Sequence, residues 1–272
     1  MSATTTLSPK AIIFDAYGTL FDVHSVVAAA EQIFPGRGDA LSQLWRQKQI
    51  EYTQLRTLAD AGEGAAHYRP FWDITLDALR FSAKKLQLTL GRTAEKRLMD
   101  EYACLSAFPD AVPALRLLRD GVSSSAATSA RPGLAILSNG NPQMLDVAVK
   151  SAGMSGLFDQ VLSVDAVRAY KPAPVAYALG TQAFGVEPRE IVFVSSNGWD
   201  VAGATWFGFT TFWLNRQNAP LEELGVTPHG TGAGMNDLLA FVNTLASAGD
   251  APRPSRATAA SRTRRPRSSG GA

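Results

Sequence analysis

Two features that membrane and secreted proteins need are missing from this sequence. It has no apolar run of the ~20 residues that a transmembrane helix requires, and its N-terminus lacks the apolar segment of a secretion signal. Cys104 is the only cysteine, so no intrachain disulfide can form. We therefore expect a cytoplasmic protein without a membrane contact, in which Cys104 is a small buried residue.

Metal-binding patterns are also scarce. The three histidines, His24, His67 and His229, have no spacing typical of zinc ligands, so we expect no histidine-based metal site. Basic charge is concentrated in residues 251–272, which hold six arginines and no acidic residue. Residues 249–272 are rich in Ser, Ala, Pro and Gly and are predicted to form a disordered tail. No aromatic residue is interleaved there for base stacking, so we expect no nucleic-acid partner.

A carboxylate follows directly on a short apolar run near the N-terminus. Residues 11–14 have the pattern of a strand that is buried on both faces of a parallel sheet, and Asp15 comes at its carboxyl end. Open α/β sheets bind their ligands at this edge. Asp15 is therefore a candidate nucleophile or metal ligand, and an Asp that merely caps the turn before Gly18 is an equally good interpretation of these residues alone.

Further apolar runs alternate with helical segments in the second half of the chain. These runs lie at residues 134–137, 161–164, 191–194 and 210–214. Alternation of strands and helices is typical of a doubly wound parallel sheet, so the sequence predicts an α/β fold with a Rossmann-like core.

The long stretch after the first strand lacks the alternation of a strand. Residues 41–58 and 71–81 carry apolar side chains at helical spacing instead. We therefore predict a core domain of residues 1–21 and 109–248, with an inserted helical cap domain at 22–108. An ordinary helical layer of a single domain is the alternative.

Polar residues follow the ends of the apolar runs, where a packed core would not place them. Ser138 and Asn139 end the second run, Lys171 lies past the third, and residues 195–200 end the fourth. The ends of parallel strands gather at one edge, so these groups are predicted to surround Asp15. Lys171 is the natural cationic partner of that carboxylate, although a solvated surface lysine is the default for this residue type.

Two residues near the fourth run are predicted to support Lys171. Asn197 and Asp200 would orient the lysine and a water, and Asp200 could at the same time cap the following helix. Arg46, in the helical stretch, could close over an anion, or it could be a surface arginine. Tyr17, Ile50, Phe71 and Trp199 could line an apolar pocket, and ordinary core packing is at least as good an interpretation for each.

The run at residues 14–25, FDAYGTLFDVHS, resembles the first motif of the haloacid dehalogenase superfamily, and within it the (S)-2-haloacid dehalogenases. Similar motifs stand at 44–49 (LWRQKQ), 137–140 (LSNG), 170–172 (YKP) and 194–200 (VSSNGWD). Phosphatases of the superfamily carry a second Asp two residues after the nucleophile, where this chain has Tyr17. The cap segment with Arg46 is also one that those phosphatases do not share in this form.

The resemblance implies a fold, a reaction and a set of roles. The implied fold is a haloacid dehalogenase core with a helical cap, and the implied reaction converts (S)-2-haloalkanoic acids to (R)-2-hydroxy acids and halide through an ester on Asp15. It implies no metal, no cofactor and a homodimer. The implied catalytic residues are Asp15, Thr19, Arg46, Lys171, Tyr177, Ser195, Asn197 and Asp200. Of these, the resemblance implies that Ser195 joins Asn197 and Asp200 in supporting Lys171 and the attacking water.

The resemblance also assigns substrate contacts. Backbone amides of Ala16 and Tyr17, together with Ser138, would hold the substrate carboxylate. Arg46, Asn139 and the edge of Trp199 would receive the halide. Ile50 and Phe71 are the further candidates for the apolar wall. Two alternatives remain at this point, a magnesium-dependent phosphatase on the same fold and a non-catalytic module that uses the basic tail on nucleic acid.

Overall fold

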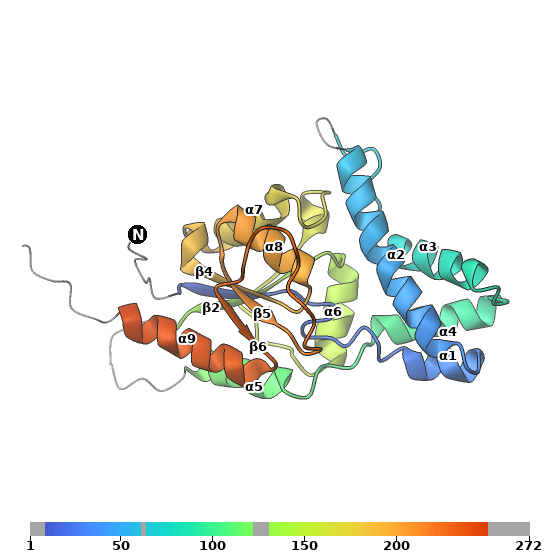
Figure 1. The fold of residues 1–272 in the computed structure, drawn as a ribbon, viewed down its shortest axis with the longest axis horizontal. Helices are drawn as coiled ribbons and strands as arrows, with labels where there is room; N and C mark the ends of the chain where they lie inside the picture. The colour runs from blue at the N-terminus through green and yellow to red at the C-terminus, as the bar shows by residue number, and fades with distance from the viewer. Residues whose placement is uncertain (1–8, 61–63, 122–130, 250–272) are drawn as a thin grey trace, which may run out of the picture.

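One six-stranded parallel sheet forms the centre of the protein (Figure 1). The computed structural model describes residues 9–60, 64–121 and 131–249 of the chain. The sheet has the strand order β3-β2-β1-β4-β5-β6. Its strands are β1 (Ala11–Phe14), β2 (Gly133–Ser138), β3 (Gln160–Ser163), β4 (Ile191–Ser195), β5 (Thr210–Leu214) and β6 (Gly230–Gly232). The predicted doubly wound parallel α/β fold is confirmed.

Helices cover both faces of this sheet, which explains why the central strands are apolar throughout. On one face, α5 (Ala111–Asp120), α6 (Pro142–Ser151) and α9 (Met235–Gly249) pack with Ile12 and Phe14 of β1. On the other face, α7 (Pro174–Phe184) and α8 (Gly198–Phe207) pack with Ala11 and Ile13. All four residues of β1 are fully buried.

Four helices lie together beside the sheet (Figure 1). They are α1 (Val27–Ile33), α2 (Gly38–Ala59), α3 (Phe71–Lys85) and α4 (Arg92–Ala103), and all come from the segment between β1 and α5. We propose that residues 22–108 form a cap domain inserted into a core of residues 1–21 and 109–248. None of the helices in the described residues is long and apolar enough to cross a membrane.

The structure corrects one expectation, contains one strand that was not predicted, and leaves the expectation about the tail untested. Cys104, predicted to be buried, is exposed, because α4 turns Leu98, Met99 and Tyr102 inward and ends beside the cysteine. The strand β6 was not predicted, since its residues have no apolar side chain and pair with β5 through the backbone. The predicted disordered tail lies outside the described residues, apart from Gly249 at the end of α9.

A glycine inside α8 allows this helix to approach the segment after β3. A Cβ atom at Gly203 would lie 2.6 Å from Cβ of Pro172 and 2.6 Å from the hydroxyl oxygen of Tyr177. Both neighbours are rigid groups that cannot easily move aside. Because Asp200 is one turn away on the same helix, this close approach also brings its carboxylate toward Lys171.

We predict that Gly203→Ala lowers the free energy of unfolding by about 1–3 kcal/mol, because overpacking a well-packed core has that cost. Urea denaturation measures the effect. Gly180→Ala in α7 is the matched control. A Cβ there would lie close only to the flexible end of Ile13, at 2.7 Å, and at ordinary contact distance from Phe209, at 3.5 Å. Alanine is also the better helix residue by roughly 0.5–1 kcal/mol. Equal losses in the two variants would contradict the prediction.

Candidate active site

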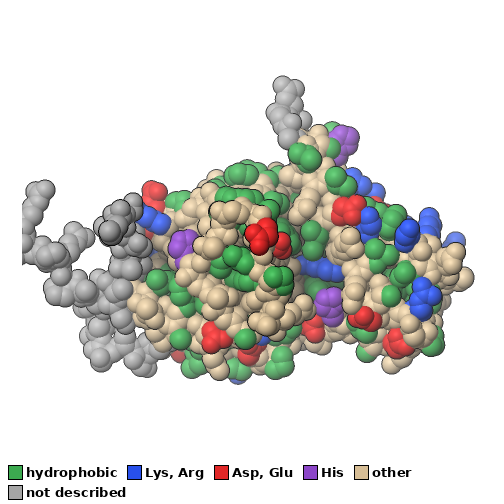
Figure 2. Space-filling view, in the orientation of Figure 1, with side chains coloured by type: hydrophobic (Ala, Val, Ile, Leu, Met, Phe, Trp, Pro, Cys, Tyr) green, Lys and Arg blue, Asp and Glu red, His purple; other side chains and the backbone are tan. Residues whose placement is uncertain are grey.

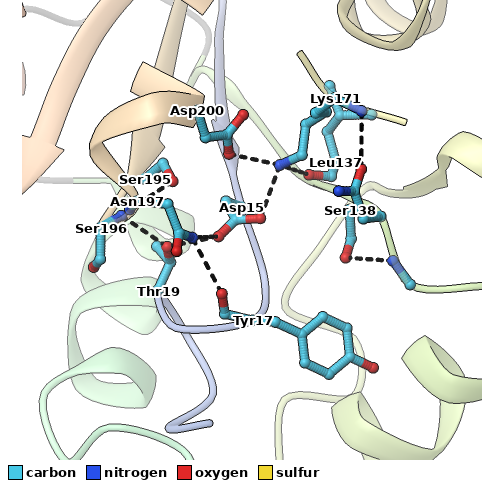
Figure 3. Close-up of polar contacts among 12 residues, drawn as sticks. Asp15, Tyr17, Thr19, Leu137, Ser138, Lys171, Ser195, Ser196, Asn197 and Asp200 are labelled. Carbon is cyan, nitrogen blue, oxygen red and sulfur yellow. Dashed lines mark hydrogen bonds and ion pairs between the residues drawn. The ribbon is translucent and has the colours of Figure 1, made fainter. Parts of the chain in front are cut away.

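Asp15 lies at the carboxyl end of the central strand β1, between the ends of β2 and β4 (Figure 3). Its side chain is almost inaccessible to solvent, with 7% exposed. The ends of the two neighbouring strands bring Ser138 and Ser195 to the same edge, and both are fully buried. Strand order therefore gathers groups from residues 15, 138 and 195 that are far apart in the sequence.

Three donors bind the two oxygens of the Asp15 carboxylate. The ammonium of Lys171 donates to Oδ1 at 2.8 Å. The hydroxyl of Thr19 donates to Oδ2 at 2.8 Å, and the amide of Asn197 donates to the same oxygen at 2.9 Å. These contacts fix the orientation of the carboxylate, which a nucleophile in a displacement at carbon requires.

Lys171 is a buried cation shared by two carboxylates. Only 1% of its side chain is exposed, and its ammonium also donates to Asp200 at 2.7 Å and to the backbone oxygen of Leu137 at 3.2 Å. Burial alone would lower the pKa of Lys171, but the charges of Asp15 and Asp200 outweigh it and raise the pKa. The lysine therefore stays protonated beside the nucleophile at neutral pH.

Asp200 is held from its other side by Tyr177. The hydroxyl of Tyr177 donates to Oδ1 of Asp200 at 2.7 Å, and both residues are fully buried. Burial raises the pKa of Asp200, the ammonium of Lys171 opposes this shift, and the charge of Asp15 adds to it. A carboxylate with a raised pKa is a better proton acceptor than an ordinary one.

Two residues that were expected to support Lys171 contact other groups. Asn197 donates to Asp15 and to the backbone oxygen of Tyr17 at 3.2 Å, so it orients the Asp15 carboxylate and not the lysine. The hydroxyl of Ser195 accepts from the backbone N–H of Asn197 at 3.1 Å, which fixes the loop after β4. Of the three residues predicted for this role, Asp200 alone touches the ammonium.

Arg46 reaches from α2 over this site. Its Nη2 donates to the backbone oxygen of Tyr17 at 3.0 Å and to the side-chain oxygen of Asn197 at 3.2 Å. Within the described residues no carboxylate lies at ion-pair distance from its guanidinium. Its neutral acceptors orient the side chain without cancelling its charge, which leaves the cation available for an anion.

A small cavity lies between these groups. Its volume is about 10 Å³, room for about one water molecule, so a larger ligand requires the cap or some side chains to shift. The residues that line it are Asp15, Tyr17, Arg46, Ile50, Thr53, Phe71, Ser138, Asn139 and Trp199. All but Thr53 were candidate site residues. Thr53 follows Arg46 and Ile50 at helical spacing on α2, a signal that would have identified it.

A wider cleft of about 490 Å³ adjoins the cavity. Arg46 and Ile50 line both spaces and form the wall between them. The space-filling view shows a hollow between the sheet and the cap helices, with basic and histidine side chains in it (Figure 2). This cleft is the open side of the site.

Several donors in the cavity region have no acceptor within residues 9–60, 64–121 and 131–249. The backbone N–H groups of Ala16 and Tyr17 donate to no other described residue. The hydroxyl of Ser138 accepts from the backbone N–H of Gly140 at 3.0 Å, which leaves its proton free. The side-chain oxygen of Asn139 accepts from the backbone N–H of Lys171 at 3.1 Å, which leaves the amide protons free. Such a group of donors suits a carboxylate and a second anion.

Tyr17 stands where phosphatases of the resembled superfamily carry a general acid. Its ring is buried and stacks on Tyr102, with ring centroids 5.8 Å apart and an interplanar angle of 15°. Burial, followed by the neighbouring Tyr102, raises the pKa of Tyr17 well above its ordinary value. A phenol with that pKa is a poor proton donor for a leaving alkoxide at neutral pH.

Comparison with known proteins agrees with this geometry. The family model of haloacid dehalogenase-like hydrolases matches residues 9–208. An (S)-2-haloacid dehalogenase from Pseudomonas sp. (strain YL) is 47% identical over 220 residues, which cover 80% of this chain and 88% of that protein. A crystal structure of an L-2-haloacid dehalogenase is 62% identical, covers 87% of this chain and 99% of its own, and has a TM-score of 0.81.

A third relative carries a covalently bound ligand. It is the L-2-haloacid dehalogenase from Xanthobacter autotrophicus with chloropropionic acid covalently bound, which is 38% identical with a TM-score of 0.75. The match covers 86% of this chain and 98% of that one. Fold, motifs and relatives lead to one conclusion: the chain belongs to the haloacid dehalogenase-like hydrolases.

Proposed function

We propose that this protein is an (S)-2-haloacid dehalogenase, a hydrolase that acts on carbon–halide bonds. The observation that carries the proposal is a buried, fixed carboxylate, Asp15, in one cavity with a guanidinium, Arg46, that has no carboxylate at ion-pair distance in the part of the chain that the structure describes. Its relatives named as (S)-2-haloacid dehalogenases and L-2-haloacid dehalogenases support the same substrate class.

In the first step Asp15 displaces the halogen. A carboxylate oxygen of Asp15 attacks C2 of the haloacid from the side opposite the halogen, a C–O bond forms, and the halide leaves with the electrons of the C–X bond. The free donors of Ala16, Tyr17 and Ser138 hold the substrate carboxylate. Fixing both partners in line supplies on the order of 7–11 kcal/mol of the barrier reduction. Inversion at C2 follows from the direction of attack.

The halide is received on the cap side of the cavity. Arg46 supplies the positive charge, and the free amide protons of Asn139 and the edge of Trp199 complete the contact. The indole nitrogen of Trp199 is buried and has no hydrogen-bond partner among the described residues, so its N–H is free for an anion. Ile50 and Phe71, with Tyr17, form the apolar wall for the carbon chain.

In the second step water hydrolyses the ester on Asp15. Asp200 accepts the proton of the attacking water, since burial raises its pKa, and Tyr177 and Lys171 hold it in place. Water oxygen adds to Cγ of Asp15, and the bond from Cγ to the ester oxygen breaks. The proton held by Asp200 passes to the departing alkoxide, which leaves as the hydroxy acid, and the Asp15 carboxylate is restored with one oxygen from water. Thr19 and Asn197 keep the carboxylate aligned through both steps, and Ser195 fixes the loop that carries Asn197.

We further propose a homodimer in the cytoplasm. The helix α2 leaves Leu55 and Leu58 54% and 72% exposed, and Phe81 of α3 is 38% exposed nearby on the cap. Exposed apolar side chains on neighbouring helices favour contact with a second copy.

The central test is the path of oxygen. In water enriched in heavy oxygen, a single turnover of (S)-2-chloropropionate is expected to place the label in Asp15 and unlabelled oxygen in the product, measured by mass spectrometry of both. Asp15→Asn should release no halide. Label that passes directly into the hydroxy acid would exclude the ester. A screen of phosphate and halide release, with and without magnesium, separates this activity from that of a phosphatase.

Removing the shared cation should affect both stability and rate. Lys171→Met leaves two buried carboxylates facing each other, so we expect a loss of about 3–5 kcal/mol in the free energy of unfolding and loss of halide release. Lys150→Met is the matched control. Lys150 pairs with Asp146 at 2.8 Å on the surface, and removing such a pair costs within about 0.5 kcal/mol. Similar stability of the two variants would contradict the proposed role.

Activity and stability should both be kept at alkaline pH until the buried groups Lys171 and Tyr177 lose their protons. The pKa of Lys171 lies above 10.5, and burial raises that of Tyr177 well above 10.0. A raised folded-state pKa contributes stability that is fully present below the unfolded-state value and is lost as pH rises through the folded-state value. Halide release and melting temperature should therefore hold up to about pH 10 and fall above it. A rate profile that already halves near about pH 8 would contradict this.

A further inference from the structure

The main chain next to Lys171 is bound from two sides. The backbone N–H of Tyr170 donates to the hydroxyl oxygen of Thr57 at 2.9 Å, and the backbone N–H of Lys171 donates to the side-chain oxygen of Asn139 at 3.1 Å. Thr57 belongs to α2 of the cap, whereas Asn139 follows β2 of the core. Two consecutive N–H groups are therefore held, one by the cap and one by the core.

The side chain of Tyr170 adds further contacts with the cap. It is fully buried, and its hydroxyl donates to the backbone oxygen of Arg69. Its ring stacks on that of Tyr68, with centroids 5.2 Å apart and an interplanar angle of 27°. It also lies 6.3 Å from the ring of Phe71, which lines the cavity beside Asp15. All of these partners come from the start of α3 and the segment before it, so a core residue is held by the cap.

These contacts matter because regular structure does not fix the segment. Residues 167–173 belong to no helix or strand, yet Lys171 must bring its ammonium to Asp15 and Asp200 (Figure 3). The place of the ammonium depends on the place of the main chain that carries it. Since a displacement of about 1 Å in a catalytic group can cost on the order of a hundredfold in rate, the contacts of Tyr170 bear on the nucleophile.

Seating of the cap does not by itself require the contacts of Tyr170. At the same junction the hydroxyl of Tyr68 donates to the carboxylate of Asp165 at 2.6 Å. Asp165 lies in the short 3-10 helix η1 (Val164–Ala166) of the core, six residues before Lys171. This bond joins cap and core without binding the segment of the lysine. The contacts of Tyr170 thus have a separate effect, which is to fix that segment.

We propose that Tyr170 is a positioning residue for the nucleophile. Held by Thr57 and Arg69 of the cap, it fixes Lys171 beside Asp15, and the nucleophile is fully aligned only while the cap is seated. The inference rests on the proposed function and extends it to residues outside the cavity.

The pH profile of the reaction reports the place of the lysine. Only the ionised form of Asp15 can attack carbon. Among the described residues, the charged groups that face it are the cations Lys171 and Arg46 and the carboxylate Asp200, while Tyr17 stays neutral because burial raises its pKa. If Lys171 moves away, the ionised form is favoured less, so the acid side of the profile moves to higher pH. A loss of packing alone would lower the rate by the same factor at every pH.

The experiment measures kcat/KM for (S)-2-chloropropionate between about pH 4 and about pH 9 in wild type, Thr57→Val and Tyr170→Phe. This parameter reports carbon–halogen cleavage even where ester hydrolysis limits kcat. We expect it to fall about tenfold at neutral pH in both variants. The acid side of the profile should move up by about half a pH unit or more. Thr57→Ser keeps the accepting oxygen and should restore the wild-type profile.

Tyr68→Phe is the matched control. It removes one hydroxyl at the same junction and keeps the ring that stacks on Tyr170, but its lost acceptor is Asp165. Its acid side should coincide with that of wild type. The inference would be overturned by an unchanged profile in Thr57→Val and Tyr170→Phe, or by a uniform fall at every pH. An equal shift in Tyr68→Phe would overturn it too, since any loosening of the cap would then have the same effect.

Failure of the parent proposal looks different. Wild-type protein that releases no halide would refute the dehalogenase function and this inference with it. Wild-type activity with an unmoved acid side in the variants would refute the inference alone. Thermal melting of each variant checks folding, and if Tyr170→Phe does not fold, the comparison of Thr57→Val with Thr57→Ser decides.

Discussion

The ammonium of Lys171 lies 2.8 Å from Asp15 and 2.7 Å from Asp200, and all three groups are nearly excluded from water. One positive and two negative charges leave an excess negative charge in a place of low dielectric, which is costly unless donors surround it. Thr19, Asn197 and Tyr177 supply those donors from three separate segments. Asp15, Lys171 and Asp200 can stay this close only because α8 packs tightly at Gly203 and the loops after β1 and β4 place the donors around them. The excess negative charge is carried by Asp15, the carboxylate that is proposed to attack carbon.

The cap then completes the electrostatics of the site. Arg46 adds one positive charge, so the charges of Asp15, Asp200, Lys171 and Arg46 sum to zero. Its acceptors are a backbone oxygen and an amide oxygen, neither of which carries a charge. A carboxylate partner would have fixed the guanidinium equally well but would have consumed its attraction for halide. Neutral acceptors orient it and preserve that attraction.

The sequence allowed prediction of the groups that backbone topology alone brings together. Asp15, Ser138 and Lys171 follow apolar runs, and parallel strands place such residues at one edge whatever their side chains do. The direction in which each side chain points was harder to predict from the sequence. Asn197 was expected on Lys171 and lies on Asp15, because the loop after β4 turns its amide inward through Ser195. The buried hydrogen bonds that link Tyr102 of α4, Gln49 of α2 and Thr75 of α3 could not be predicted either, since they depend on packing between three helices that one helix pattern does not contain.

Tyr17 joins the two halves of the site, and this explains why one substitution in the first motif has wide consequences. Its backbone oxygen accepts from Arg46 and Asn197, while its ring packs with Phe71 and Tyr102 of the cap. An aspartate at this position could not fill that aromatic cluster, and a charged side chain there would compete for Arg46. The ring also approaches Gly140 so closely that a Cβ there would lie 2.7 Å from it. The residue that stands in the place of a phosphatase's general acid is thus also the residue that packs the cap against the loop that carries Asp15, so one side chain accounts both for the missing acid and for the seating of the cap.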